Sequence, residues 1–229
     1  MPGHAVRIAV FAKAPVPGEV KTRLIPALGA EGAARLHREL VRHALAAATG
    51  AAEGMSTAAR AASVEPASVE LWCAPDAGHA FFTDCASEFR VSVHGQGPGD
   101  LGERMARCFA CADGATLLIG SDIPAMDAGC LDAAAAALSG ADAVFVPAED
   151  GGYVLVGLRG GLGAARHAVF RDIEWGSAGV MQQTRERLRA SGLAWRELPP
   201  LWDLDRPADL ARLASCGLGA LAAKAEAAP

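Results

Sequence analysis

The sequence lacks a long hydrophobic run. Although 52% of its 229 residues are hydrophobic, no stretch approaches the roughly 18 apolar residues that a membrane-spanning helix needs. The apolar stretch at residues 8–12 is too short for a signal-peptide core, and no convincing cleavage site follows it. We therefore expect a cytoplasmic protein without a membrane span.

Internal repeats, long linkers and runs of like charge are also missing, so nothing marks a domain boundary. The length suits one globular α/β domain. We therefore expect a single domain over residues 1–229. Residues 50–66, rich in Ala, Gly and Ser, either extend the preceding helix or form a mobile surface loop.

A second cysteine pair is missing beside the C-x-x-C of Cys108 and Cys111, so neither a zinc site nor a thioredoxin-like motif is complete. Ordinary packing in a helix is the simpler interpretation of this pair. Nothing addresses the chain to an oxidising compartment, so we expect free thiols throughout. The six cysteines are Cys73, Cys85, Cys108, Cys111, Cys130 and Cys216.

The chain has no excess of positive charge. Its formal net charge of −5 argues against nucleic acid as a partner. The charge is unevenly distributed, because residues 1–50 hold seven Lys and Arg against three Glu, a net of +4 that leaves −9 for the rest. A locally basic region on an acidic protein suits a small anionic ligand.

Apolar, β-branched runs alternate with helical periodicity along the chain. This alternation predicts a mostly parallel sheet in a three-layer α/β/α fold, with ligands bound at the carboxyl edge of the strands. Strands are expected at residues 6–11, 69–73, 89–94, 116–119, 143–146 and 153–158 and near Trp195, and helices at 31–49, 127–138 and 178–189.

The loop after the first strand, within FAKAPVPGEVKTRL, has the composition of a phosphate-binding loop. Its turn formers would hold backbone N–H groups outward, and its cations and hydroxyl add further donors. Neither G-x-x-x-x-G-K-[ST] nor G-x-G-x-x-G is present, which disfavours an ATPase or a dehydrogenase. A solvated basic loop is the alternative. The residues concerned are Lys13, Pro15, Pro17, Gly18, Lys21, Thr22 and Arg23.

The segment LIGSDIP delivers Ser121 and Asp122 to the end of a buried strand. A carboxylate there can hold Mg²⁺ or Mn²⁺, because hard cations favour oxygen ligands that they share with phosphate. The alternative is that Asp122 caps the helix that follows.

The segment PAEDGGY lies between two strands. Gly151 and Gly152 let a ligand approach the backbone, and Glu149 and Asp150 are available as acceptors or bases. A plain turn would explain the glycines alone, but it explains the acid pair and Tyr153 less well.

The segment WDLDRPADL places Asp203 and Asp205 on one side of an extended chain, as metal coordination requires. Asp205 could instead cap the next helix, and Asp209 more plausibly serves that helix's N-terminus. In QGPGDLGERM, the amide of Gln96 could read a base edge, and Asp100 or Arg104 could touch ribose or phosphate. The glycines of this segment suit any tight turn.

In order, FAKAPVPGEVKTRL, QGPGDLGERM, LLIGSDIPAM, PAEDGGYVLVGL and WDLDRPADL resemble the bacterial family of rSAM/selenodomain-associated transferase 1, a glycosyltransferase-like family. The resemblance spans nearly the whole chain. It implies the nucleotide-diphospho-sugar transferase (GT-A) fold and a likeness to the guanylyltransferases of molybdenum-cofactor and phospholactate metabolism.

The resemblance also implies roles for individual residues. Related nucleotidyltransferases grip a triphosphate with the first loop, read a base at the position of Gln96, and hold metal at the positions of Asp122 and Asp205. The chain replaces their G-G-x-x-x-R loop with proline and lysine, and it lacks a D-x-D at Asp122 because residue 120 is Gly120. Both donor classes therefore stay open.

Together these features predict a metal-dependent transferase that uses Mg²⁺ or Mn²⁺ with a nucleotide-activated donor and a small-molecule acceptor that the sequence does not identify. The family label favours glycosyl transfer from a nucleotide sugar, whereas the cationic loop favours nucleotidylyl transfer from a nucleoside triphosphate. A binding protein without turnover is a third possibility, against which the number of carboxylates argues. The predicted catalytic residues are Lys21, Arg23 and Asp150; the nucleotide-binding residues are Lys13, Pro15, Gly18, Lys21, Thr22, Arg23, Gln96, Gly102 and Ser121; the metal ligands are Asp122 and Asp205; and the acceptor-binding residues are Glu149, Gly151, Gly152, Tyr153 and Asp203.

Overall fold

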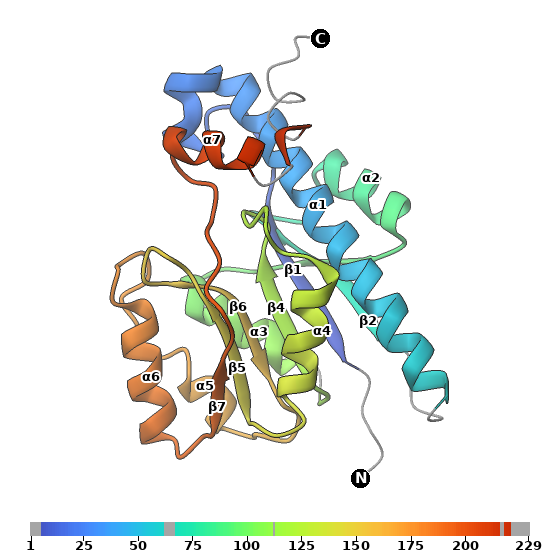
Figure 1. Cartoon of the computed structure of the whole chain (residues 1–229), viewed down its shortest axis with the longest axis vertical. Helices are drawn as coiled ribbons and strands as arrows, with labels where there is room; N and C mark the ends of the chain where they lie inside the picture. Colours follow the sequence, from blue (N-terminus) through green and yellow to red (C-terminus); the bar gives the residue numbers. More distant parts are fainter. Residues whose placement is uncertain (1–5, 62–66, 112, 216–217, 221–229) are drawn as a thin grey trace.

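A seven-stranded sheet forms the centre of the computed structural model, which describes residues 6–61, 67–111, 113–215 and 218–220. The strands lie in the order β3-β2-β1-β4-β6-β5-β7, with helices on both sides (Figure 1). Their bounds are β1 Arg7–Lys13, β2 Ser68–Ala74, β3 Ser92–Gly95, β4 Thr116–Gly120, β5 Ala143–Pro147, β6 Tyr153–Leu158 and β7 Trp195–Glu197.

The sheet is parallel except at β6. Strand β1 pairs in parallel with β2 and β4, whereas β6 runs antiparallel to both β4 and β5. Only a short turn joins β5 to β6, and a connection of that length cannot make the crossover that parallel strands require. The mostly parallel α/β fold predicted from the sequence is confirmed.

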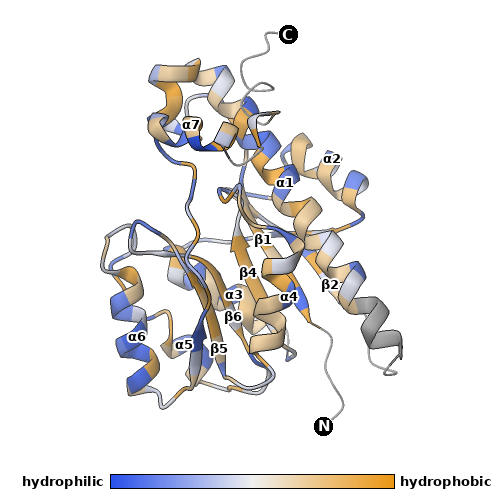
Figure 2. Cartoon of the chain, viewed as in Figure 1, coloured by the Kyte–Doolittle hydropathy of each residue, from blue (hydrophilic) through white to orange (hydrophobic). Residues whose placement is uncertain are grey.

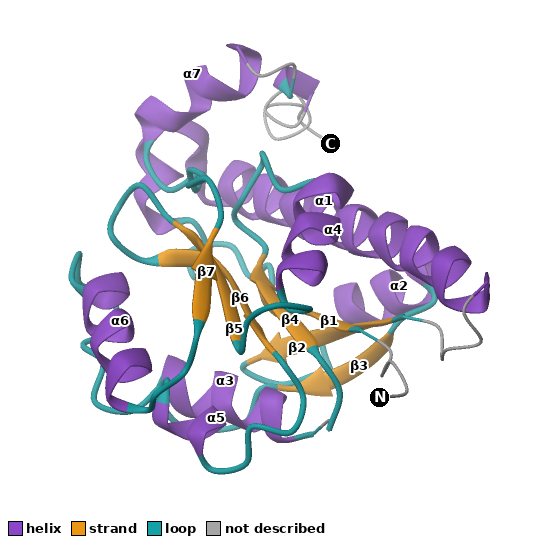
Figure 3. Ribbon diagram, turned by 60° about the horizontal axis from the view of Figure 1, so that its bottom comes forward, coloured by secondary structure: helices purple, strands orange, loops and turns teal. Residues whose placement is uncertain are grey.

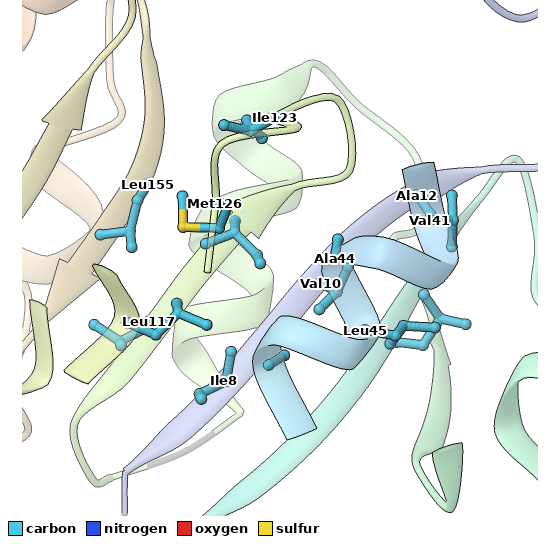
Figure 4. Packing of buried hydrophobic residues seen from close by; sticks show 14 of the residues in the cluster. Ile8, Val10, Ala12, Val41, Ala44, Leu45, Leu117, Ile123, Met126 and Leu155 are labelled. Atoms are coloured by element: carbon cyan, nitrogen blue, oxygen red, sulfur yellow. The ribbon is translucent and has the colours of Figure 1, made fainter. Parts of the chain in front are cut away.

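Two helical layers enclose the sheet (Figure 3). Helices α1, α2 and α4 cover one face, and α3, α5 and α6 cover the other. Figure 4 shows Val41, Ala44 and Leu45 of α1 beside Ile8 and Val10 of β1. The helix bounds are η1 Thr22–Leu24, α1 Ile25–Ala61, α2 Ala80–Phe89, α3 Leu101–Ala110, α4 Ala128–Ala137, α5 Ala165–Ala168, α6 Val180–Ala190 and α7 Pro207–Ser215.

The central strands are apolar along their length because both of their faces are covered. Every residue of β1 except Lys13 is buried, and β4 is buried as far as Ile119. Figure 2 shows hydrophobic colours along the sheet and hydrophilic residues on the outer helix α6. The polar residues that follow β1 and β4 therefore stand at the end of buried, apolar strands.

A third hydrophobic cluster joins residues 24–40 to residues 202–213. Trp202 and Leu204, together with Leu213 of α7, pack against Leu24 of η1 and Leu36 of α1. This contact brings residues 201–205 across the carboxyl edge of the sheet, next to the loop that follows β1 (Figure 1).

Two expected elements have different bounds. The helix expected at residues 31–49 is α1, which extends to Ala61 and is interrupted at Gly29, where φ is 69° and ψ is 168°. Residues 50–61 thus extend the helix, and residues 62–66 lie outside the described chain. The strand expected from residue 89 is wrong at its start, because Phe89 ends α2 and Arg90 terminates that helix in a left-handed conformation.

The thiol prediction holds wherever the structure can test it. All five cysteines in the described ranges are free, and Cys216 lies outside them. No helix among the described residues combines the length and the apolar character that crossing a membrane would require.

Candidate functional site

Two adjoining pockets open at the carboxyl ends of β1 and β4. We call the first, of about 580 Å³, the basic pocket. We call the second, of about 260 Å³, the aromatic pocket. Phe11, Leu101, Gly120 and Asp122 line both. The basic pocket is further lined by Ala12, Lys13, Glu19, Val20, Lys21, Thr22, Arg23, His37, Gln96, Arg104, Ser121 and Asp205, and the aromatic pocket by Met105, Leu118, Ile123, Ala148, Asp150, Gly152, Tyr153, Val154, Val156, Trp175, Gly176, Ser177, Val180 and Asp203.

Asp122 stands where the two pockets meet. Its Oδ2 lies 3.0 Å from Lys21 Nζ and its Oδ1 lies 3.6 Å from His37 Nδ1, while its side chain remains 45% exposed. Burial raises the pKa of the Asp122 carboxyl, but the Lys21 charge and the contact with His37 outweigh burial and hold that pKa well below its usual range. Asp122 is therefore a carboxylate anion that keeps one face open to the pockets.

The alternative of Asp122 as a helix cap is wrong. Helix α4 is capped by Asp127, whose side chain accepts a hydrogen bond from the N–H of Cys130. The backbone of Asp122 serves a different contact, because its carbonyl accepts the N–H of Leu204 at 2.8 Å.

Lys21 connects the first loop to the C-terminal segment. Its ammonium group is buried and donates to the carbonyl of Leu204 as well as contacting Asp122. The backbone of Lys21 adopts a left-handed conformation, with φ of 48°. Such a conformation costs a non-glycine residue about 1–3 kcal/mol and persists only where surrounding contacts enforce it.

His37 was not predicted to be part of the site. Its Nε2 lies 3.0 Å from the carbonyl oxygen of Lys13, and since a carbonyl only accepts, Nε2 is the donor. The buried Nδ1 faces Asp122 without a hydrogen-bond partner. The available signal was a histidine on the apolar face of α1, next to Leu36 and one turn before Val41.

The other residues of the first loop differ in whether they line the basic pocket. Arg23 forms an ion pair with Asp205, and the exposed Lys13 and Thr22 line the basic pocket. Pro15 and Gly18 were also predicted to bind the nucleotide, but they are not among the described residues that line this pocket. Several of the loop's N–H groups bond within the protein, so they are not available to a ligand; these belong to Ala14, Val16 and Glu19.

Outside the first loop, some of the residues predicted to bind the nucleotide line the basic pocket and one does not. Gln96 lines the basic pocket, but its side-chain nitrogen donates to the carbonyls of Trp72 at 2.9 Å and Ala12 at 3.4 Å. Ser121 lines the pocket beside Asp122. Gly102 is buried in α3, where an added Cβ would lie 2.8 Å from the Trp175 ring. Gly102 therefore permits close packing behind the aromatic pocket.

The aromatic pocket is built on a chain of ring contacts. The Tyr153 ring meets Phe145 at 5.1 Å and Trp175 at 6.3 Å, both edge-on. Burial raises the pKa of the Tyr153 phenol, so this group is neutral and does not act as a base.

Two acids border the aromatic pocket. Asp150 accepts the N–H of Gly152 at 3.0 Å. The pKa of Asp203 is raised, first by burial and then by the nearby charge of Asp150. By contrast, Glu149 forms a bidentate ion pair with Arg212 of α7 at 2.8 and 2.9 Å, and it is not among the described residues that line the aromatic pocket.

Of the two predicted glycines, Gly151 is the one that packing requires. Gly151 has a φ of 95°, and a Cβ added there would lie 2.1 Å from the carbonyl oxygen of Ala178. The carbonyl of Gly151 also accepts the N–H of Met181 at 2.9 Å. These contacts fix the turn that carries Asp150 against the start of α6.

The family model described as "Uncharacterized protein conserved in bacteria (DUF2064)" matches residues 57–177, which is more than half of the chain. The chain belongs to this family. None of the curated proteins matches the DUF2064 chain in sequence.

Solved structures place this DUF2064 protein among nucleotide-diphospho-sugar-transferase-like folds. A candidate nucleotide-diphospho-sugar transferase from Desulfovibrio desulfuricans G20 is 31% identical, with 89% of this chain and 83% of that chain covered and a TM-score of 0.71. A cytidylyltransferase from Leptospira borgpetersenii is 13% identical, with 93% and 86% covered and a TM-score of 0.56.

A nucleotidyl transferase from Methanothermobacter is also 13% identical, with 95% of this chain and 100% of that chain covered and a TM-score of 0.56. The structural neighbours are transferases, the class that the sequence predicted for this chain. At 13% identity, the cytidylyltransferase and the nucleotidyl transferase share only their fold with this chain.

The predicted metal site can be compared with the metal-ligating side chains that the DUF2064 chain offers. No group of three or more His, Cys, Asp or Glu side chains that could hold a metal ion occurs among the described residues. Asp122 nevertheless has an open face, and Mg²⁺ is commonly held by one or two carboxylates together with substrate phosphates. The residues present therefore fit a metal that arrives with a phosphorylated ligand, and they do not form a metal cage of their own.

Proposed function

We propose that this protein is a transferase that uses a nucleotide-activated donor. The observation that carries the proposal is the pair of adjoining pockets that share Asp122, one lined by cations and the other by aromatic rings and acids. A phosphate chain in the basic pocket would direct its reactive end towards a group in the aromatic pocket. Such positioning is the main requirement of group transfer from phosphate donors.

The side chains of the basic pocket suit a diphosphate. Four cations line it, namely Lys13, Lys21, Arg23 and Arg104, against the three acids Glu19, Asp122 and Asp205. Oxygen anions of a phosphate chain would compete with Asp205 for Arg23, whose ion pair is largely exposed and therefore weak. Lys21 and Arg23 would then stabilise the charge that develops on the leaving phosphate.

A nucleotide sugar is the donor that we favour. With one net positive charge among its lining side chains, the basic pocket matches a donor of low charge. The adjoining aromatic pocket provides the ring faces and acids that a sugar or hydroxylated group needs. The narrower resemblance to rSAM/selenodomain-associated transferase 1 supports the same donor.

A nucleoside triphosphate is the second candidate donor. The concentration of cations within one short loop favours it, because Lys13, Lys21 and Arg23 would neutralise a departing pyrophosphate. In that reaction the α-phosphate would be transferred to an acceptor in the aromatic pocket.

The chemistry at the acceptor would depend on the two acids. Asp203 has a raised pKa and lies close to Asp150, so either group is placed to take a proton from an acceptor hydroxyl. A divalent metal, when bound with the donor, would be held by Asp122 with Asp205 and would neutralise charge on the phosphate oxygens.

Thermal unfolding tests the proposal directly. The protein is heated with nucleoside triphosphates or nucleotide sugars, with and without Mg²⁺ or Mn²⁺, and the best ligands are then incubated with candidate acceptors for product analysis by mass spectrometry. We expect stabilisation by one donor class, since a ligand that binds only the folded state raises Tm. Stabilisation by neither class would refute the proposal, and the identity of the product separates the two donors.

The matched variants are Asp122→Asn and Asp132→Asn. Both remove one carboxylate charge, but Asp132 is exposed on α4, outside the described lining of both pockets. We expect Asp122→Asn to lose the metal-dependent part of the stabilisation and Asp132→Asn to keep it. Unchanged metal dependence in Asp122→Asn would remove Asp122 from the metal site.

A further inference from the structure

The charge of the aromatic pocket restricts what it can bind. Two of its lining side chains are carboxylates in addition to the shared Asp122, and none of the described residues that line it is Lys, Arg or His. Lys21, which contacts the shared Asp122, is buried against that carboxylate and the Leu204 carbonyl and lines the basic pocket instead. The pocket therefore has a negative electrostatic character.

Asp150 and Asp203 line the pocket together, and neither forms a salt bridge with a Lys, Arg or His side chain among the described residues. A phosphate or carboxylate placed between these groups would meet like charges and be repelled. Anionic groups are thus disfavoured.

The remaining walls suit a small group with apolar and hydroxylated faces. Trp175 and Tyr153 are partly exposed ring systems, and Phe11 and Leu101 form the side next to the basic pocket. The volume of about 260 Å³ lies just below the range of drug-sized sites, so the occupant is small. Carboxylates accept hydrogen bonds from hydroxyls and amines, and aromatic faces attract cations.

We propose that the aromatic pocket selects a small uncharged polyol or a protonated amine, without phosphate or carboxylate, as the group that reacts with the nucleotide donor. This inference rests on the proposed function and adds the substrate class. The group is either the sugar of the donor or the separate acceptor, and both have the same chemistry. The pocket thereby separates the reacting group from the phosphates, which bind where the cations lie.

Saturation-transfer NMR with matched small molecules tests this selection. The probes come in three sets, each comprising an alcohol, an amine and a phosphate: glucose, glucosamine and glucose 6-phosphate; glycerol, serinol and glycerol 3-phosphate; benzyl alcohol, benzylamine and benzyl phosphate. With excess inorganic pyrophosphate present to occupy the basic pocket, we expect the alcohol or amine on every scaffold that binds to exceed the phosphate by about threefold or more, as like-charge repulsion predicts. Equal or stronger binding of the phosphates, or binding of no scaffold, overturns the inference.

Charge variants test whether the aromatic pocket is the cause of this preference. Asp203→Lys should reverse the preference towards phosphates, whereas Asp132→Lys makes the same charge change on exposed α4 and should leave the preference intact. If Asp203→Lys does not fold, Asp203→Asn should reduce the discrimination to less than half of the wild-type ratio. A preference that survives the Asp203 substitution places the selection elsewhere and overturns the inference.

Two further measurements separate the possible sources and the two proposals. UDP-glucose should displace bound glucose if the pocket holds the donor sugar, and it should leave glucose bound if the pocket holds the acceptor. Nucleotide binding is followed by thermal unfolding on the same samples. If the protein binds no nucleotide, the proposed function is refuted. If it binds nucleotides but prefers the phosphate probes, only the inferred substrate class is refuted.

Discussion

Asp203 lies where the fold disfavours its charge. Its pKa is raised in the folded protein by burial and by Asp150, so the ionised form destabilises the native state. Below about pH 4 the group is protonated in both states and the penalty disappears; it develops as pH rises through the folded-state pKa. The stability cost is therefore present at neutral pH and absent in acid.

We predict that Asp203→Asn raises stability at pH 7, by up to about 1 kcal/mol, because it removes the charge and keeps a side-chain oxygen acceptor. Denaturant unfolding at several pH values measures the difference between variant and wild type. The difference should shrink as pH falls towards about 3. A gain that is independent of pH would show that the carboxylate charge is not its source.

Gly151 fixes the turn that carries Asp150. Substitution by Ala would combine a φ of 95° with a contact of 2.1 Å to the Ala178 carbonyl oxygen. Gly161 offers a matched control, because its φ of 77° is similar and a Cβ added there would have nothing within 4 Å. The two substitutions therefore share the backbone cost and differ in the steric clash.

We predict that Gly161→Ala costs about 1 kcal/mol, as expected for a left-handed alanine. Gly151→Ala should cost at least about 1–3 kcal/mol more, because the turn must move away from α6. Chemical denaturation of both variants measures the difference. Similar costs would mean that the turn shifts freely, and Asp150 would then not be held in place.

His37 shows what the sequence could not reveal at the residue scale. Its position on the apolar face of α1 was readable, but its partner Asp122 is 85 positions away and approaches only after β1 and β4 pair. The same holds for Lys21, whose contact with Leu204 spans 183 positions. Charge and turn composition indicated a basic loop at a strand end, but they could not indicate which of its cations are buried.

At the scale of elements, α7 holds the C-terminal side of the site. Leu213 is fully buried and packs with Trp202 and Leu204 against the start of α1. In the same segment, the carbonyl of Leu204 accepts a hydrogen bond from Lys21, and the carboxylate of Asp205 forms an ion pair with Arg23. Loosening α7 should therefore affect both stability and the basic pocket.

We predict that Leu213→Ala destabilises the protein by about 2–4 kcal/mol, through lost burial and an unfilled cavity. Leu101→Ala makes the same chemical change at a side chain that is 45% exposed and should cost less than about 1 kcal/mol. Denaturant midpoints provide the comparison. Equal costs would show that α7 is not an integral part of the fold.

The elements themselves were largely predictable. Strands buried on both faces appear as continuous apolar runs, which is why β1, β4 and β6 were found close to their observed bounds. The antiparallel direction of β6 was not predicted, because strand pairing depends on contacts distant in sequence. The end of α2 was missed because Arg90, without a glycine to mark it, adopts the left-handed conformation that stops the helix.

At the scale of the whole molecule, the distribution of charge matters more than its sum. The net charge is −5, whereas the basic pocket collects four cations. A nucleotide, the proposed ligand, would be repelled by the protein as a whole and attracted locally. Exposed charges separated by more than about 8–10 Å are screened at physiological salt, so the local attraction should dominate.

Two arginine variants separate the local field from the total charge. Arg104→Gln and Arg171→Gln both lower the net charge by one, but Arg104 lines the basic pocket and Arg171 is exposed outside its described lining. We predict that Arg104→Gln weakens UDP binding about 2–5-fold at low salt, the range of an exposed ion pair. Calorimetric titration at about 50 and 500 mM NaCl should show this difference shrinking as salt screens the charges. Arg171→Gln should match the wild type, because a total-charge effect would weaken both variants equally.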